Sequence, residues 1–195
     1  MQERVLGFAA LFALSHAISF AQLHPKPTVA TDITDEQVKE VLKHAPHGVG
    51  QQLVDQQLKV VDVGPYNVAV GVVHRGPTKD TNDGTAPCIQ HHKATETYII
   101  VSGGGTLVTG GTIMNAKEEP KTSETYTTLA GPTADGRVRT SEAQIRSVKP
   151  GDIIIIPPDV CHGWIGITDY VDYLSVRPDP DHLLPAGYVN PAIRK

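Results

Sequence analysis

Aromatic and charged residues are scarce in this chain of 195 residues, where they make up 5% and 19% of the sequence. The formal net charge is -4, and no cluster of lysine and arginine interrupts it. A broad basic surface for nucleic acid or for an anionic membrane is therefore excluded. The motifs of phosphate loops, serine hydrolases, zincins and thioredoxin-type redox proteins are absent as well. These absences remove several common enzyme classes from consideration.

Long helical patterns are also missing. Glycine (18 residues) and proline (15) are frequent instead. They separate short runs rich in Val, Ile, Thr and Tyr, such as 66–75, 95–103 and 152–158. Evenly spaced short strands with little helix predict an all-β sandwich, jelly roll or closed barrel. At this length we expect one domain with a core of its own.

The first 21 residues differ from the rest of the sequence. MQERVLGFAALFALSHAISFA has an arginine near its start, then an apolar run, then small residues at Ser19 and Ala21. We interpret 1–21 as a cleaved secretory signal peptide, with an uncleaved anchor as the alternative. The mature chain is then expected to be secreted or periplasmic. No later segment is apolar for long enough to span a membrane.

Three further regions follow the signal peptide. Residues 22–56 are expected to form an N-terminal arm with one short helix, because Thr34 and Gln37 have the spacing of a capping box. The strand-like runs fill 57–178, the predicted barrel, and 179–195 form an extended, proline-rich tail.

Within the barrel, residues 115–143 are more polar than their surroundings. We interpret them as a long surface excursion, in which Ala-Asp-Gly at 134–136 marks a hairpin turn.

A group of polar residues accompanies two of the predicted strands. Gln90 and His92 are two residues apart and share a strand face, and Glu96 can return to that face after a short loop. His162 comes at the end of a second strand, after a proline-containing turn. If both strand ends open into one barrel, the four side chains form a mononuclear metal site with open positions. The alternative is that they satisfy one another by hydrogen bonds without a metal.

These segments resemble the two sequence motifs of the cupin superfamily, G-x5-H-x-H-x3–4-E-x6-G and G-x5-P-x-G-x2-H-x3-N. The matching residues are Gly84, His92, Glu96 and Gly103 in the first motif and Gly151, Pro157 and His162 in the second. Gln90 replaces the first histidine of the pattern, Asp159 the second-motif glycine and Gly166 the asparagine.

The resemblance implies a cupin-type jelly-roll β-barrel with a short N-terminal helix and extended terminal arms. It also implies a homodimer, in which we expect those arms to be exchanged because neither can bury itself against a small barrel unaided. The expected ligands of one divalent metal ion are Gln90, His92, Glu96 and His162. Fe(II) or Mn(II) is favoured over Zn, Ni or Cu because a glutamine oxygen is a harder donor than imidazole.

His91 faces outward in this register. A register that uses His91 instead also fits Glu96, but it puts Ile89 in the first ligand position and breaks the spacing from Gly84.

Four other residues are candidates for the pocket. Tyr98 shares the parity of Glu96, so it is a candidate acid, base or substrate donor as well as a candidate core residue. Trp164 shares the parity of His162 and is a candidate for the pocket wall. His74 and Tyr173 are further candidates for lining the cavity.

The expected partner is a small oxygenated organic molecule, and the leading function is that of a dioxygenase, with Glu96 as ligand and local charge. An O2-independent lyase or isomerase is the first alternative, with Tyr98 or Glu96 moving the proton. A non-catalytic metal or small-molecule binding module is the second.

Two cysteines, Cys88 and Cys161, complete the inventory. Export favours a bridge between them. However, Cys88 has the parity of Gln90 and His92, whereas Cys161 has the parity opposite to His162. If these polar residues face one interior, the cysteines point to opposite sides, so we expect no disulfide.

Overall fold

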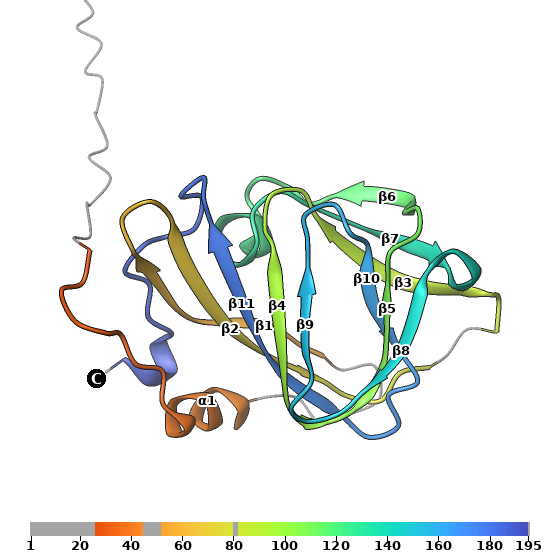
Figure 1. Cartoon of the computed structure of the whole chain (residues 1–195), viewed down its shortest axis with the longest axis horizontal. Helices are drawn as coiled ribbons and strands as arrows, with labels where there is room; N and C mark the ends of the chain where they lie inside the picture. Colours follow the sequence, from red (N-terminus) through yellow and green to blue (C-terminus); the bar gives the residue numbers. More distant parts are fainter. Residues whose placement is uncertain (1–25, 45–51, 80–81, 195) are drawn as a thin grey trace, which may run out of the picture.

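Two antiparallel sheets make up the computed structural model, which describes residues 26–44, 52–79 and 82–194 (Figure 1). The first sheet has the order β1 (Gln52–Asp62), β2 (Asn67–Arg75), β11 (Val171–Asp179), β4 (Glu96–Gly103) and β9 (Ile153–Ile156). The second has the order β6 (Met114–Glu118), β7 (Thr133–Arg139), β3 (Thr85–His91), β10 (His162–Ile165), β5 (Gly105–Thr109) and β8 (Gln144–Val148). The jelly-roll fold expected from the sequence is confirmed. The predicted signal peptide, 1–21, lies outside the described residues.

The main core lies between the inner faces of the two sheets. Tyr98 and Ile100 on β4 meet Leu107 on β5 and Trp164 on β10, and all four are buried. Because strand side chains alternate, every second residue of these strands points into this layer. The polar residues of the same parity are therefore carried into the interior too.

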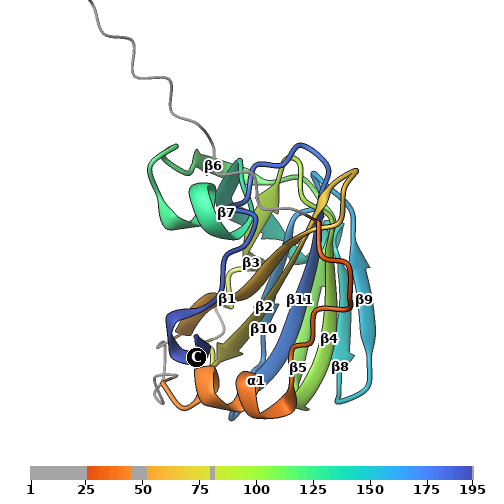
Figure 2. The same cartoon turned by 90° about the vertical axis from the view of Figure 1, so that its left-hand side faces the viewer.

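The single α-helix of the described residues covers the outer face of the first sheet. Helix α1 (Asp35–Leu42) begins at Thr34, and the predicted capping box with Gln37 is present. Its Val41 packs with Leu58 on β1 and with Ile193 from the chain's C-terminal segment. Figure 2 shows α1 and that segment beside β1 and β2.

The C-terminal tail also docks on its own barrel. Asn190 donates its backbone N–H to the Leu58 carbonyl over 2.8 Å, and a short 3-10 helix (Pro191–Ile193) follows. Helix α1 and the C-terminal segment thus bury apolar side chains against the outer face of β1 and β2 of their own chain, whereas residues 26–32 are exposed. Exchange of the arms between subunits stays a prediction.

The two cysteines form a disulfide, Cys88–Cys161, which corrects the expectation of free thiols. Both sulfurs lie in a small apolar cluster on the outer face of the second sheet, with Ala86, Val108 and Val138. We call this group the outer cluster. The parity rule itself holds, since each cysteine side chain lies on the strand face opposite to its neighbouring histidine, His91 or His162. The error was the choice of which polar residues face inward.

The segment 115–143 is not only a surface excursion. Its residues Thr133–Arg139 form β7, which pairs with β3 at seven consecutive positions from Thr85↔Arg139 to His91↔Thr133. Ala-Asp-Gly at 134–136 lies inside this strand and makes no hairpin turn. A β-carbon at Gly136 would lie 2.6 Å from Ile113 Cγ1 and 2.7 Å from the Met114 carbonyl oxygen, so the glycine permits the close approach of the neighbouring chain. The rest of the segment holds β6, a helical turn (Thr125–Leu129) and a 3-10 turn (Thr140–Glu142).

Candidate metal centre

Glu96 stands at the start of β4, on the strand's inward face. Its neighbours on that face are Tyr98 and Ile100, and its side chain is 3% exposed. An ionised carboxylate at this depth requires compensating partners. It has them from both sheets.

Two histidines reach Glu96 from the opposite sheet. His91 is the last residue of β3 and His162 the first of β10. Both are buried. The two strands meet at the pair Ile89↔His162, so their ends lie side by side. Both imidazoles therefore enter the same end of the barrel, opposite Glu96.

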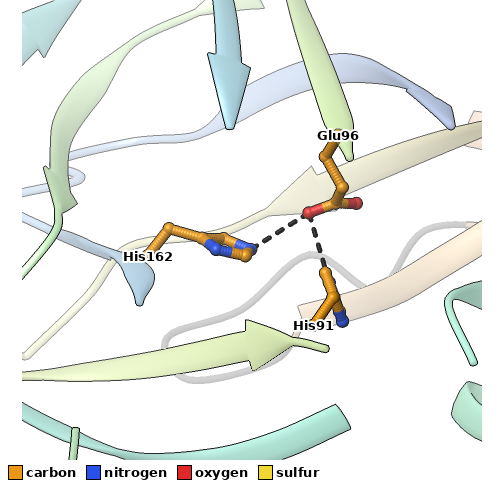
Figure 3. Close-up of side chains that lie close together, drawn as sticks. All are labelled: His91, Glu96 and His162. Atoms are coloured by element: carbon orange, nitrogen blue, oxygen red, sulfur yellow. Dashed lines mark ion pairs between the residues drawn. The ribbon is translucent and has the colours of Figure 1, made fainter. Parts of the chain in front are cut away.

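The three side chains converge on one carboxylate oxygen, as Figure 3 shows. Glu96 Oε2 lies 3.0 Å from His162 Nε2 and 3.2 Å from His91 Nε2. A metal bonded at about 2.1 Å to each atom would separate ligands at right angles by about 3 Å. The observed spacing fits neighbouring ligands of one ion, and this is the His91–Glu96–His162 triad.

Hydrogen bonds on the far side of each ring define which nitrogen carries the proton. His162 Nδ1 lies 2.8 Å from the Val160 carbonyl oxygen, which can only accept. His91 Nδ1 lies 2.7 Å from Thr133 Oγ1, whose own hydrogen goes to the Gly131 carbonyl. Both Nδ1 atoms therefore donate, and a neutral ring presents a lone pair at Nε2.

Lone pairs on two nitrogens thus face a carboxylate oxygen, which is stable only with a positive charge among them. That charge is either a proton on the rings or a metal ion. Among the described residues, His162 Nε2 has no hydrogen-bond partner of acceptable geometry, although Oε2 is near. A buried atom without such a partner fits a metal ligand better than a ring N–H. The donor set, two imidazoles and one carboxylate, can hold a divalent ion with open positions.

The second carboxylate oxygen of Glu96 is held from its own sheet. Ser175 Oγ donates to Oε1 over 2.7 Å, and Arg177 Nη1 lies 3.9 Å from the same atom. Arg177 also pairs with Asp55 Oδ2 at 2.5 Å. These contacts orient the carboxylate so that Oε2 faces the histidines.

The surroundings keep Glu96 ionised and Tyr98 protonated. Burial alone would raise the pKa of Glu96, but His91 and His162 together hold it well below its ordinary value. Burial and the neighbouring Glu96 carboxylate raise the pKa of Tyr98 well above its ordinary value. Tyr98 accordingly donates its hydroxyl to Glu96 Oε2 over 3.0 Å.

Of the four predicted ligands, the structure brings together Glu96 and His162. Gln90 and His92 lie on the outside, where Gln90 Nε2 is 3.2 Å and His92 Nδ1 is 2.8 Å from Asp159 Oδ1. The His92 side chain is 31% exposed and its Nε2 also contacts Glu118. His91 takes the place expected for His92, because β3 runs to residue 91 with odd-numbered side chains inward. A glutamine ligand is thereby removed from the site.

A cavity of about 730 Å³ opens beside the triad. Tyr98, Trp164 and Tyr173 line it, as the sequence predicted. His74 is not among the described residues that line it. Val73 lines the cavity, and His74, as the next residue of β2, points to the opposite face of the strand. There its Nδ1 lies 2.6 Å from Asp172 Oδ1. The placement of His74 in the cavity was therefore wrong.

Sequence reasoning also missed Ser175, Arg177 and Arg75. The parity of β11 already aligns Tyr173 with Ser175 and Arg177, so an inward Tyr173 predicts two inward polar residues. Arg75 lines the cavity and donates from Nε to Tyr173 Oη over 2.8 Å. It lies two residues after Val73, again on the inner face.

No family model and no curated protein matches this chain. Among solved structures, the DMSP lyase DddQ from Ruegeria pomeroyi is similar, with a TM-score of 0.40 and 15% identity over 75% of this chain and 55% of that one. A conserved protein with a double-stranded beta-helix domain from Klebsiella pneumoniae has a TM-score of 0.36 and 17% identity, over 65% of this chain and 79% of that one. An oxalate decarboxylase has a TM-score of 0.35 and 15% identity, over 58% of this chain and 22% of that one.

The matched part spans less than two thirds of several of these proteins, with 22% and 31% of two oxalate decarboxylases and 38% of a chain from a study of DMSP lyases. Likeness of this extent does not transfer an activity. The resemblance to cupins rests on the motif residues and on the two-sheet fold. Within the described ranges, no helix has the length and apolar character needed to cross a membrane.

Proposed function

We propose that this protein is a metal-dependent enzyme acting on a small oxygenated organic molecule. The observation that carries the proposal is the convergence of the His91, Glu96 and His162 ligand atoms beside a cavity of about 730 Å³. A site with three protein ligands leaves positions for substrate, and the cavity supplies the room for it.

The donor set favours Fe(II) or Mn(II), with Zn, Ni or Cu as less favoured occupants. Two imidazoles and one carboxylate suit several first-row metals, and the carboxylate suits Mn(II) in particular. When bound, such an ion polarises substrate oxygens as a Lewis acid or, if it is redox-active, takes part in oxygen chemistry.

The protein's own residues orient the site and supply a proton. Ser175 and Arg177 fix Oε1 of Glu96, and Tyr98 donates to Oε2. Tyr98 keeps its proton because of its raised pKa, so it is a hydrogen-bond donor or acid toward substrate and not a resting base. Trp164 and Tyr173 form an aromatic wall, with ring centroids 5.4 Å apart.

A dioxygenase is the leading reaction class, as proposed from the donor set. Tyr98 favours a second candidate, an O2-independent lyase or isomerase, because a buried hydroxyl beside the metal ligand can protonate a leaving group. Oxygen consumption during turnover separates the two: a dioxygenase consumes one O2 per product, whereas a lyase works equally well without oxygen.

We also infer export and a small-molecule partner for the mature protein. The disulfide supports export, since such bonds persist mainly in oxidising compartments. Both basic and acidic side chains line the cavity, which suits a polar small molecule: Arg75, Lys79 and Arg137 on one hand and Asp55, Glu96, Glu119 and Asp135 on the other. A homodimer remains a proposal from the cupin resemblance, and sedimentation of the mature chain would test it.

The test of the metal site compares two adjacent histidines. Metal content is measured by elemental mass spectrometry on the native protein and on His91→Ala, Glu96→Ala, His162→Ala and His92→Ala variants. We expect about one equivalent of metal in the native protein. The first three variants should lose it, and His92→Ala, the matched control, should keep it.

Absence of metal from the native protein, even after reconstitution with Fe(II) and Mn(II), would refute the proposed enzyme. Loss of metal from His92→Ala but not from His91→Ala would restore the register that the structure rejects.

A further inference from the structure

The disulfide joins the two strands that carry the histidines of the triad. Cys161 directly precedes His162, and Cys88 lies three residues before His91 on β3. The Cα atoms of the two cysteines are 5.7 Å apart. The covalent link therefore lies immediately behind the two imidazoles, on the opposite face of the same sheet.

Regular pairing between these two strands is short in the described part of the chain. β3 and β10 are paired only at Ile89↔His162, whereas β3 and β7 are paired at seven positions and β10 and β5 at four. Near the triad, the turn before β10 makes further contacts with the end of β3. Asp159 donates its backbone N–H to the His91 carbonyl over 2.8 Å, and its carboxylate contacts Gln90 and His92 on the exposed surface.

The backbones of the two strands approach closely beside the disulfide. A β-carbon at Gly163 would collide with the Pro87 carbonyl oxygen and lie 3.2 Å from Cys88 Cα. The disulfide and Gly163 thus act at the same place. The disulfide links the strands covalently on the side of the outer cluster, and Gly163 allows their backbones to approach because it has no side chain.

Glu96 is positioned independently of this link. Its partners Ser175 and Arg177 lie on β11 of the first sheet. A small separation of β3 from β10 would leave Glu96 in place and change the distance between the two imidazoles. The ligand geometry therefore depends on how firmly these strands are held together.

We infer that Cys88 and Cys161 are positioning residues of the metal site: their disulfide sets the separation of His91 and His162 and thereby the affinity for the metal. The inference rests on the proposed metal-dependent function. It assigns to a structural bond an effect that appears in metal binding, beyond its effect on stability.

The test uses the full mature chain stripped of metal and titrated with Co(II), whose visible absorption reports its coordination. The variant Cys88→Ala/Cys161→Ala breaks the link, and Cys88→Val/Cys161→Ala breaks it while restoring volume to the outer cluster. We expect the dissociation constant to rise at least about tenfold in both and the Co(II) spectrum to change, since loss of an outer support costs about 10- to 100-fold in metal affinity.

Val138→Ala is the matched control, because it removes buried volume from the same cluster and leaves the disulfide intact. Val138 has only a packing role, so its replacement should lower the melting temperature and change the Co(II) dissociation constant by less than about twofold. All titrations are made well below the melting temperature, with folding verified by circular dichroism.

Three results are distinguishable. Weak Co(II) binding confined to the disulfide variants supports the inference. Native-like affinity and spectrum in either folded disulfide variant would overturn it while leaving the metal site intact. Failure of the native protein to bind Co(II) at all would instead remove the proposed function, and the inference with it. If Cys88→Ala/Cys161→Ala does not fold, the Co(II) affinity of Cys88→Val/Cys161→Ala alone tests the inference.

Discussion

Residue parity explains both what the sequence predicted of the site and what it did not. Glu96, Tyr98, His162, Trp164 and Tyr173 were placed correctly because strand side chains alternate. His91 was missed because the motif spacing favoured His92. A disulfide assumed from the outset would have decided the matter: if Cys88 and Cys161 share one face, the histidines opposite them are His91 and His162. The expectation of a disulfide and the parity of the polar residues disagree if His92 faces inward, and they agree if His91 does.

Arg177 is a buried cation between two carboxylates, Asp55 and Glu96. Arg177→Met should destabilise the metal-free protein by about 3–5 kcal/mol, because it leaves two buried acids without their counter-charge. Urea unfolding measures the loss. The double variant Asp55→Asn/Arg177→Met should recover part of it. A double variant no more stable than the single one would show that the charges are not coupled.

Asp135 provides a test of pH dependence. Although the residue is exposed overall, partial desolvation of its carboxyl group raises its pKa, and Glu119 raises it further through a hydrogen bond and through its negative charge. A raised folded-state pKa stabilises the protein below the unfolded value, about 3.9 for Asp, and this contribution is lost as the pH rises through the folded pKa. The melting temperature of Asp135→Asn minus that of the native protein should therefore be larger at about pH 7.5 than at about pH 4.

The control for Asp135 is its partner. Glu119→Gln should relieve the same repulsion, so the double variant should gain less than the two single variants together. A melting-temperature difference between Asp135→Asn and native that is equal at both pH values would contradict the coupling.

At the scale of elements, β-branched residues and turn chemistry predicted most strands and the capped helix α1. β7 was missed because Thr-Ala-Asp-Gly-Arg-Val-Arg lacks clean apolar alternation. It buries Thr133, Ala134 and Val138 but exposes Asp135 and Arg139. Its place between β6 and β3 comes from pairing with neighbours far along the chain, which a local pattern does not encode.

Gly136 tests the packing of β7 against the preceding chain. Gly136→Ala should cost about 1–3 kcal/mol, because the new methyl group overlaps Ile113 and the Met114 carbonyl. Denaturant unfolding measures the cost. In the variant Gly136→Ala/Ile113→Ala the penalty should be smaller than the sum of the single penalties, since one obstacle is gone. Strict additivity would argue against the overlap.

At the scale of the whole molecule, the disulfide spans 73 residues. Chain-entropy reasoning gives about 4 kcal/mol for a loop of this length. Cys88→Ala/Cys161→Ala should lose a comparable free energy of unfolding, and the denaturant slope should rise because the unfolded chain becomes less compact. An unchanged slope with a loss below about 1 kcal/mol would indicate that the unfolded chain is compact without the bond.

The position of Cys88 on β3 also bears on how the chain reaches its fold. A slip of β3 by one residue would turn His91 outward and point Cys88 at the cavity, away from Cys161. Oxidation can then seal only molecules in which the strand has paired correctly. We therefore expect the disulfide to favour, during maturation, the alignment that completes the triad, and misaligned chains to keep two free thiols and so remain able to rearrange.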